Sequence, residues 1–253
     1  MIIDAHAHLG YDEIFDEDFP ESALLEGQKA DGIDVTLVQP CTVHDLESVR
    51  RQHDAISDLA LRHPGRFHGI ANPNPHLAGG RYEAEVRRCV EKLKFVGIKM
   101  HPWAHAVNPL GRHGRRVFAL GAELGVPVMV HTGSGIPWSA PALLGPVAED
   151  HPNLRIIVAH AGAMILAGEA ALLAERHPNV YLECSWTAGF LAAAWARQFG
   201  PERVIFGSDH ADNAATELTK FRTSGLTPDE LDWVLGRAAA RAFNLQVGES
   251  RPA

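Results

Sequence analysis

The amino-acid sequence predicts an α/β protein, a (β/α)8 or TIM barrel, in which residues 1–253 form a single domain. Eight short apolar runs alternate with segments of helical periodicity along the whole chain, as in parallel sheets whose strands are joined by helices. No stretch rich in proline, glycine and serine marks a second domain. The alternative is an open doubly wound sheet. That fold typically carries GxGxxG after its first strand, and here the first strand ends in histidines.

The apolar runs are short and bounded by turn residues, which is typical of buried strands. We expect strands at Ile2–His8, Val35–Gln39, Arg66–Ala71, Val96–His101, Val126–His131, Leu154–His160, Val180–Cys184 and Val204–Asp209.

Helical periodicity is clearest in four segments between these strands. They are Leu46–Arg62, Arg81–Leu93, Gly114–Leu124 and Ala188–Phe199. A last helix is predicted from Pro228 to Phe243, packed on the barrel. His63, His151 and His177 each precede a proline at a predicted helix end, where the helix dipole favours a histidine, so we expect them to be structural.

Composition favours a cytoplasmic enzyme with a small-molecule substrate. A net charge of -8 and a pI near 6.0 argue against nucleic acid or an anionic membrane surface as a partner. The three cysteines are odd in number and lack CxxC spacing, so reduced thiols are expected. No basic-then-apolar leader precedes Asp4, and no apolar stretch reaches the roughly 20 residues of a membrane span.

The first strand carries the most informative pattern, because it contains His6 and His8. Side chains alternate along a strand, so the two imidazoles point to the same face. Two solvated surface histidines are the simpler interpretation. However, the flanking residues are apolar, and imidazole pairs are half of a transition-metal site. We therefore predict metal binding here.

Polar side chains also occupy the carboxyl ends of further predicted strands, where a barrel places its active site. With the histidine pair they form the set His6, His8, Lys99, His101, His131, His160 and Asp209. Alternation predicts that the aliphatic neighbours of these residues face the helices. The same rule turns Asp4 inward, beneath His6, where it could orient an imidazole.

The motifs HAHLG, GIKMHP, HTG, HAG and GSDH, in this order, resemble those of the amidohydrolase superfamily. The branch they resemble is the amidohydrolase-related group that contains aminocarboxymuconate-semialdehyde decarboxylase. The resemblance implies that His6, His8, His131 and Asp209 are metal ligands, with Asp209 also catalytic. It implies that His160 is a catalytic or second-metal histidine. One divalent ion is expected, Zn²⁺ first and Mn²⁺ as the alternative.

Lys99 has two interpretations. In binuclear relatives a lysine on the fourth strand is carboxylated and bridges two metals, and Lys99 with His101 and His160 could then serve a second metal. Alternatively, Lys99 is a cation that pairs with a substrate carboxylate, or with Asp4 or Asp209. We prefer a single metal ion.

The substrate pocket is less clearly marked. Trp103, Trp138 and Trp186 follow strands and are candidates to line a pocket for a flat molecule, although they could equally plug loops. The acidic segment 12–18 could contribute to a lid, but a solvated loop is the preferred interpretation.

The predicted activity is hydrolysis of an amide, lactone or ester bond in a small carboxylated or ring-containing molecule, through a metal-activated water. The alternative is a metal-dependent decarboxylase of an aromatic or enoic acid. Few arginines fall in the loops that would anchor a carboxylate, which favours hydrolysis. A non-catalytic metal-binding barrel is the third interpretation. A homodimer is the default expectation.

Overall fold

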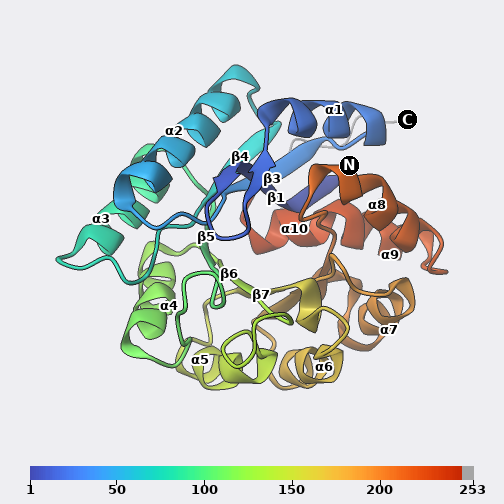
Figure 1. Ribbon diagram of the computed structural model, residues 1–253. Coiled ribbons are helices and arrows are strands. Elements are labelled where there is room, and N and C mark those ends of the chain that lie inside the picture. Colours follow the sequence, from blue (N-terminus) through green and yellow to red (C-terminus); the bar gives the residue numbers. More distant parts are fainter. Residues whose placement is uncertain (247–253) are drawn as a thin grey trace.

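One sheet organises the fold, and its strands follow one another in chain order. The computed structural model describes residues 1–246 (Figure 1). Nine strands are ordered β2-β1-β3-β4-β5-β6-β7-β8-β9. They are β1 (Ile3–Asp12), β2 (Glu17–Phe19), β3 (Val35–Pro40), β4 (Phe67–Ala71), β5 (Gly97–Met100), β6 (Val128–His131), β7 (Ile156–Ala159), β8 (Val180–Glu183) and β9 (Val204–Ile205). Neighbours are parallel except for the antiparallel pair β1–β2.

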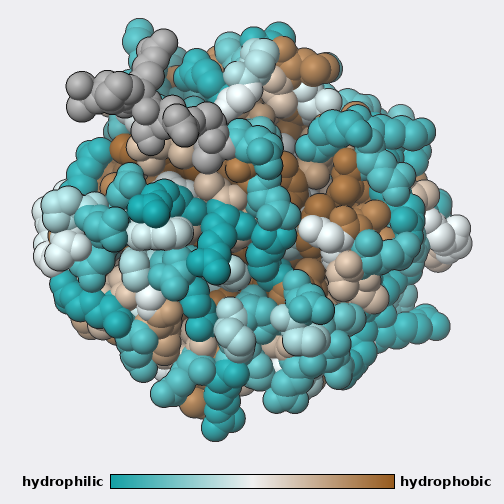
Figure 2. Space-filling model, turned by 180° about the vertical axis from the view of Figure 1, so that it is seen from behind, coloured by the Kyte–Doolittle hydropathy of each residue, from teal (hydrophilic) through white to brown (hydrophobic). Residues whose placement is uncertain are grey.

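Helices connect the parallel strands and surround the sheet (Figure 1). They are α1 (Glu21–Asp31), α2 (Leu46–Arg62), α3 (Arg81–Arg87), α4 (Arg112–Leu124), α5 (Gly145–Asp150), α6 (Ala167–Arg176), α7 (Gly189–Phe199), α8 (Ala214–Arg222), α9 (Pro228–Asp232) and α10 (Ala238–Ala242). Seen from behind, hydrophilic residues cover most of the surface and hydrophobic ones lie between them, as expected of amphipathic helices (Figure 2). Within residues 1–246 no helix is long and apolar enough to cross a membrane.

The sheet curls so that β9 approaches β1. Asp209 donates its backbone N–H to the His6 carbonyl at 2.7 Å, and Ala5 donates to Phe206 at 3.1 Å. Ala7 and Asp209 form a single parallel bridge. The structure is thus an α/β fold with a curled nine-stranded sheet. Within the described residues, β1 and the segment after β9 meet through these contacts, and complete closure into the predicted eight-stranded barrel stays a prediction.

Side-chain alternation sorts the core into two layers, as predicted. Val128 and Val130 of β6 belong to the apolar cluster between sheet and helices. Met129, between them, belongs to the cluster inside the curl. A similar alternation in β5 turns Ile98 and Met100 outward and Lys99 inward. The carboxyl ends of the strands therefore present inward-facing side chains to one cavity.

The C-terminal segment is continuously helical over residues 228–242, close to the single helix predicted from Pro228 to Phe243. It contains α9, a π-helical turn at Trp233–Arg237, and α10. Its alanines and Phe243 pack into the interior cluster with β1 and β3. Phe243 reaches the start of β5, where a Cβ on Gly97 would lie 3.1 Å from its ring. This segment therefore covers the amino ends of the strands and leaves their carboxyl ends open.

Candidate active site

A cavity of about 210 Å³ lies at the carboxyl ends of the strands. The predicted residues that line it are His8, Lys99, His101, His131, His160 and Asp209, joined by Asp12, Phe15, Glu17, Phe19 and His210. His6 is fully buried and contacts Lys99 and Asp209. The structure thus brings together all seven residues that strand-end positions singled out.

His6, His8 and Asp209 form a group of converging ligand-type atoms. Oδ1 of Asp209 lies 3.1 Å from Nε2 of His6 and 3.3 Å from Nε2 of His8. Burial opposes ionisation of Asp209, but His6 and His160 attract its negative charge and hold its pKa well below the usual value. Asp209 is therefore ionised at neutral pH.

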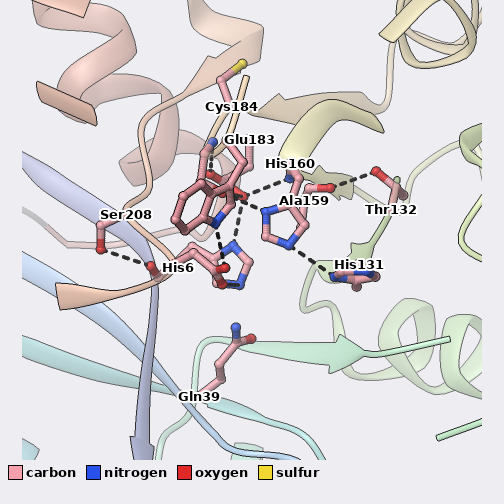
Figure 3. Close-up of polar contacts among 12 residues, drawn as sticks. His6, Gln39, His131, Thr132, Ala159, His160, Glu183, Cys184 and Ser208 are labelled. Atoms are coloured by element: carbon pink, nitrogen blue, oxygen red, sulfur yellow. Dashed lines mark hydrogen bonds and ion pairs between the residues drawn. The ribbon is translucent and has the colours of Figure 1, made fainter. Parts of the chain in front are cut away.

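Glu183, at the end of β8, orients His6 and was missed by the sequence analysis. Its Oε2 lies 2.8 Å from Nδ1 of His6 and accepts the backbone N–H of His160 at 3.1 Å (Figure 3). Burial raises the pKa of Glu183, but the contacts with His6 outweigh this effect and lower the pKa to about 2. The sequence did contain a signal for Glu183, because it is a charged residue at the carboxyl end of an otherwise apolar strand. The same pattern identified Asp209.

Asp4 does not orient His6 as predicted. The pairing of β1 with β3 is irregular between Asp4 and Ala7, where β1 contains one extra residue. Such a bulge moves the residues before it to the opposite face. Asp4 instead accepts the backbone N–H of Ser208 at 2.9 Å and that of His6 at 3.1 Å. Burial raises the pKa of Asp4 to about 7.

His160 and His131 are joined through their rings. Nε2 of His160 lies 3.1 Å from Nδ1 of His131, and Nδ1 of His160 lies 2.8 Å from the Ser185 hydroxyl (Figure 3). His101 stacks on His131, with ring centroids 4.0 Å apart. Burial lowers the pKa of His160 to about 4, so this imidazole is neutral at neutral pH. His131, a predicted ligand, lines the same cavity but is not part of the converging group of His6, His8 and Asp209.

Lys99 is almost completely buried, and its Nζ lies 2.9 Å from Nε2 of His6. Burial lowers the pKa of Lys99 to about 8. Among the cavity-lining residues it is the single lysine or arginine. It therefore provides the cavity with a cation that the count of arginines in the sequence did not reveal.

The hairpin formed by β1 and β2 lies along one side of the cavity, and its charged residues 13 and 16–18 are exposed, as the solvated loop preferred from the sequence implies. Phe15 lies in a T-shaped contact with Trp103 at 5.3 Å, and Phe19 packs 5.5 Å from the His8 ring. Asp12 is buried and accepts backbone N–H groups, including that of Thr42 at 2.8 Å. Phenylalanines, which the sequence analysis did not select, thus form the apolar wall.

The three predicted pocket tryptophans have different surroundings. Trp103 packs against Phe15 beside the cavity, and Trp186 donates a hydrogen bond from its indole to Asp209 at 2.8 Å. Trp138 is partly exposed in the loop after β6. Trp186 therefore contacts a residue of the site, whereas none of the three tryptophans is among the cavity-lining residues.

Comparisons with solved structures show the same fold at low identity. 5-Carboxyvanillate decarboxylase from Sphingomonas paucimobilis is 16% identical over 97% of this chain and 99% of its own, with a TM-score of 0.74. A dihydroxybenzoic acid decarboxylase from a Polaromonas species, with bound manganese and 2-nitroresorcinol, is 16% identical over 98% of each chain, with a TM-score of 0.77. 4-Oxalomesaconate hydratase from Rhodopseudomonas palustris is 17% identical over 96% of each chain, with a TM-score of 0.71.

A family model described as amidohydrolase matches residues 3–245. No curated protein matches the sequence. The match spans every residue that lines the cavity. This chain therefore belongs to the amidohydrolase family, as its motifs indicate.

Proposed function

We propose that this protein is a metal-dependent decarboxylase that releases CO₂ from a small aromatic or otherwise unsaturated acid. The observation that carries this proposal is the composition of the cavity. Lys99 provides a buried cation opposite the ionised Asp209, between walls that include Phe15 and Phe19. Two of the similar structures described above are decarboxylases of hydroxylated benzoic acids. We therefore prefer the decarboxylase to the hydrolase, which nothing in the comparisons supports specifically.

The donor set supports a divalent ion held by His6, His8 and Asp209. The ligand-type atoms of these residues lie within 4.8 Å of one another. Ligands about 2.0–2.2 Å from a tetrahedral ion are about 3.3–3.6 Å apart, close to the separations from Asp209 to the two imidazoles. His131 remains the candidate fourth ligand. Imidazole suits Zn²⁺ and carboxylate suits Mn²⁺, so the donor set alone does not choose between them, and we propose Mn²⁺ because a similar decarboxylase contains it.

When bound, the ion supplies positive charge that attracts the acidic groups of a substrate. The chain's own residues would do the rest. Lys99 would pair with the substrate carboxylate, and the phenylalanines would flank the ring and exclude water. The bond between ring carbon and carboxyl carbon breaks, and its electron pair stays on the ring carbon. The ionised Asp209 can take a proton from a substrate hydroxyl and return it to that carbon. Solvent then restores the hydroxyl proton.

The test is an assay of CO₂ release from a panel of hydroxylated benzoic acids and short enoic acids, with protein loaded with Mn²⁺. Lactones, amides and esters of similar size form the parallel panel. We expect CO₂ release in the first panel and no hydrolysis in the second. Hydrolysis without CO₂ release would overturn the proposal in favour of a hydrolase. Inactivity on both panels, in protein that retains the metal, would favour a non-catalytic role.

A further inference from the structure

Trp186 contacts both the site and a neighbouring helix. Its indole Nε1–H donates to Oδ2 of Asp209 at 2.8 Å, and its backbone N–H donates to Oε1 of Glu217 on α8 at 3.0 Å. The side chain is 47% exposed, so packing alone does not hold it in place. Two specific hydrogen bonds, one at each end of the residue, determine where the indole lies.

The backbones of the two bonded residues are both unusual. Trp186 has φ 59° and Asp209 has φ 65°, in the left-handed region that residues with a Cβ rarely adopt. Such backbones persist where surrounding contacts hold them, and they cluster at functional sites. At Trp186 the backbone N–H bond to Glu217 is such a contact. At Asp209 the backbone N–H donates to the His6 carbonyl at 2.7 Å.

Helix α8 holds the loops after both β8 and β9. The buried Glu217 accepts hydrogen bonds from Asn213 and Lys220 as well as from Trp186. Lys220 also donates to the Cys184 carbonyl at 2.6 Å, and Asn213 donates to the Ser208 carbonyl at 3.1 Å. Trp186 and Asp209 are therefore fixed relative to each other through one helix.

The two oxygens of Asp209 have separate partners. Oδ1 lies 3.1 Å from His6 and 3.3 Å from His8, whereas Oδ2 accepts the indole N–H of Trp186. A carboxylate with one oxygen engaged in this way cannot rotate freely about its last bond. The indole thus keeps Oδ1 directed at the two histidines.

We propose that Trp186 is a positioning residue that holds the Asp209 carboxylate with one oxygen facing His6 and His8, and that Glu217 fixes Trp186 for this role. The inference deepens the proposed function and rests on it for the identity of the metal. The substitution Trp186→Phe keeps an aromatic ring and removes the N–H donor. Loss of an outer partner of a metal ligand typically weakens metal binding about 10- to 100-fold.

The first readout is the affinity for Mn²⁺ in the absence of substrate, measured by electron paramagnetic resonance of the free ion. We expect Trp186→Phe to bind Mn²⁺ at least about tenfold more weakly than the wild type. Trp233→Phe is the matched control, because Trp233 lies in the C-terminal segment, stacked beneath Arg237 at 3.9 Å. This control should bind Mn²⁺ like the wild type. Equal affinity in the two variants would overturn the inference and leave the proposed function intact.

The second readout needs no metal. The indole N–H signals of the five tryptophans are recorded by proton–nitrogen NMR on the metal-free protein, and Trp186 is assigned by its loss in Trp186→Phe. We expect Asp209→Asn to move the Trp186 signal more than the other four, because its acceptor changes charge. An unmoved Trp186 signal refutes the inference even if the protein binds no metal. If the Trp186 signal shifts but the protein does not bind metal, the hydrogen bond between Trp186 and Asp209 is supported and the proposed metal site is refuted.

Discussion

At the scale of single residues, the buried charges of the cavity are matched by direct partners. Glu183 and Lys99 contact the two ring nitrogens of His6, and Asp209 lies between the rings of His6 and His8. Removing one member leaves its partners buried without compensation, which is costly. The effect of a substitution here depends on whether the new side chain keeps the hydrogen bonds and changes the charge alone.

Asp209→Asn keeps the shape of the side chain and removes its charge. We expect turnover to fall at least about a hundredfold, since general acid–base groups contribute at least this much. The urea unfolding midpoint should fall, because the buried Lys99 loses a counter-charge, but the variant should remain folded under the assay conditions. CO₂ release measures the first quantity and circular dichroism the second. Asp212→Asn, an exposed neighbour, is the matched control. Wild-type turnover in Asp209→Asn would remove this residue from the mechanism.

Replacing His6 and His8 together by alanine should abolish metal binding, because two of the three converging ligand atoms are lost. Elemental analysis after loading with Mn²⁺ and gel filtration gives the metal content per chain. We expect about one ion in the wild type and none in the double variant. The paired control is His63→Ala with His151→Ala, at helix ends. Stoichiometric metal in the His6 and His8 variant would refute the proposed ligands.

Sequence reasoning was strongest for residues whose strand has a regular register. The carboxyl-end rule located Asp209, His131 and His160 around one cavity. The alternation rule failed for Asp4, because one extra residue in β1 exchanges the two faces of the strand. The hydrophobic pattern does not show this extra residue. Glu183 was missed although the rule applied to it, because the predicted strand ended one residue later, at Cys184.

At the scale of elements, helix bounds were predicted closely because capping residues and prolines are local signals. The prediction Leu46–Arg62 matches α2, where the side chain of Asp45 caps the first turn. The predicted helix Ala188–Phe199 agrees with α7 to within one residue. The C-terminal helix was also predicted to within one residue, but its π-helical turn at Trp233–Arg237 was not, since such a turn depends on packing and has no sequence signature.

Side-chain contacts between different helices could not be predicted from the sequence. His53 of α2 lies 2.9 Å from Glu85 of α3, a residue 32 positions away. Arg50 and Arg88 also donate to the fully buried Glu85. Burial raises the pKa of Glu85, but hydrogen bonds from these three residues outweigh burial and hold the pKa well below its usual value. This group therefore joins α2 to α3 through an ionised carboxylate.

Glu85→Gln should destabilise the protein by about 3 kcal/mol at neutral pH, because Arg50 and Arg88 lose the buried counter-charge that they contact. A lowered folded-state pKa stabilises the fold above the unfolded pKa, near 4.5, and this stabilisation is lost as pH falls below it. The difference in the free energy of unfolding between wild type and variant should therefore become smaller below about pH 4.5. Urea unfolding at several pH values measures it. The control is Glu91→Gln, which removes an exposed ion pair with Arg87. It should change the free energy of unfolding by less than about 1 kcal/mol. A difference independent of pH would contradict this account.

At the scale of the whole molecule, the two ends of the curled sheet have different roles: one is packed for stability and the other holds the candidate site. The C-terminal segment packs at the amino ends of the strands, and the cavity lies at their carboxyl ends. The alternation of strands and helices predicted this arrangement. The extent of closure between β9 and β1 was not predictable, because it depends on how far two short segments pair.

Mn²⁺ should stabilise the folded protein as a whole, since a site built from β1 and the loop after β9 exists only in the native state. At about 100 times the dissociation constant, the ligand adds about 2.7 kcal/mol. For a chain of this size that raises Tm by about 5–10 °C. Differential scanning calorimetry with and without Mn²⁺ measures the shift. An equal shift in the variant lacking His6 and His8 would locate binding elsewhere.

The positions of the five tryptophans have a practical consequence. Trp103, Trp138 and Trp186 are exposed in loops at the carboxyl ends of the strands, whereas Trp195 is buried among the helices and Trp233 lies beneath Arg237. Indole emission responds to the polarity of its surroundings. A compound that enters the cavity changes the surroundings of Asp209 and Phe15, which Trp186 and Trp103 contact, while the other three indoles contribute a constant background. The protein thus carries its own optical reporter, and candidate substrates can be screened by unlabelled fluorescence titration.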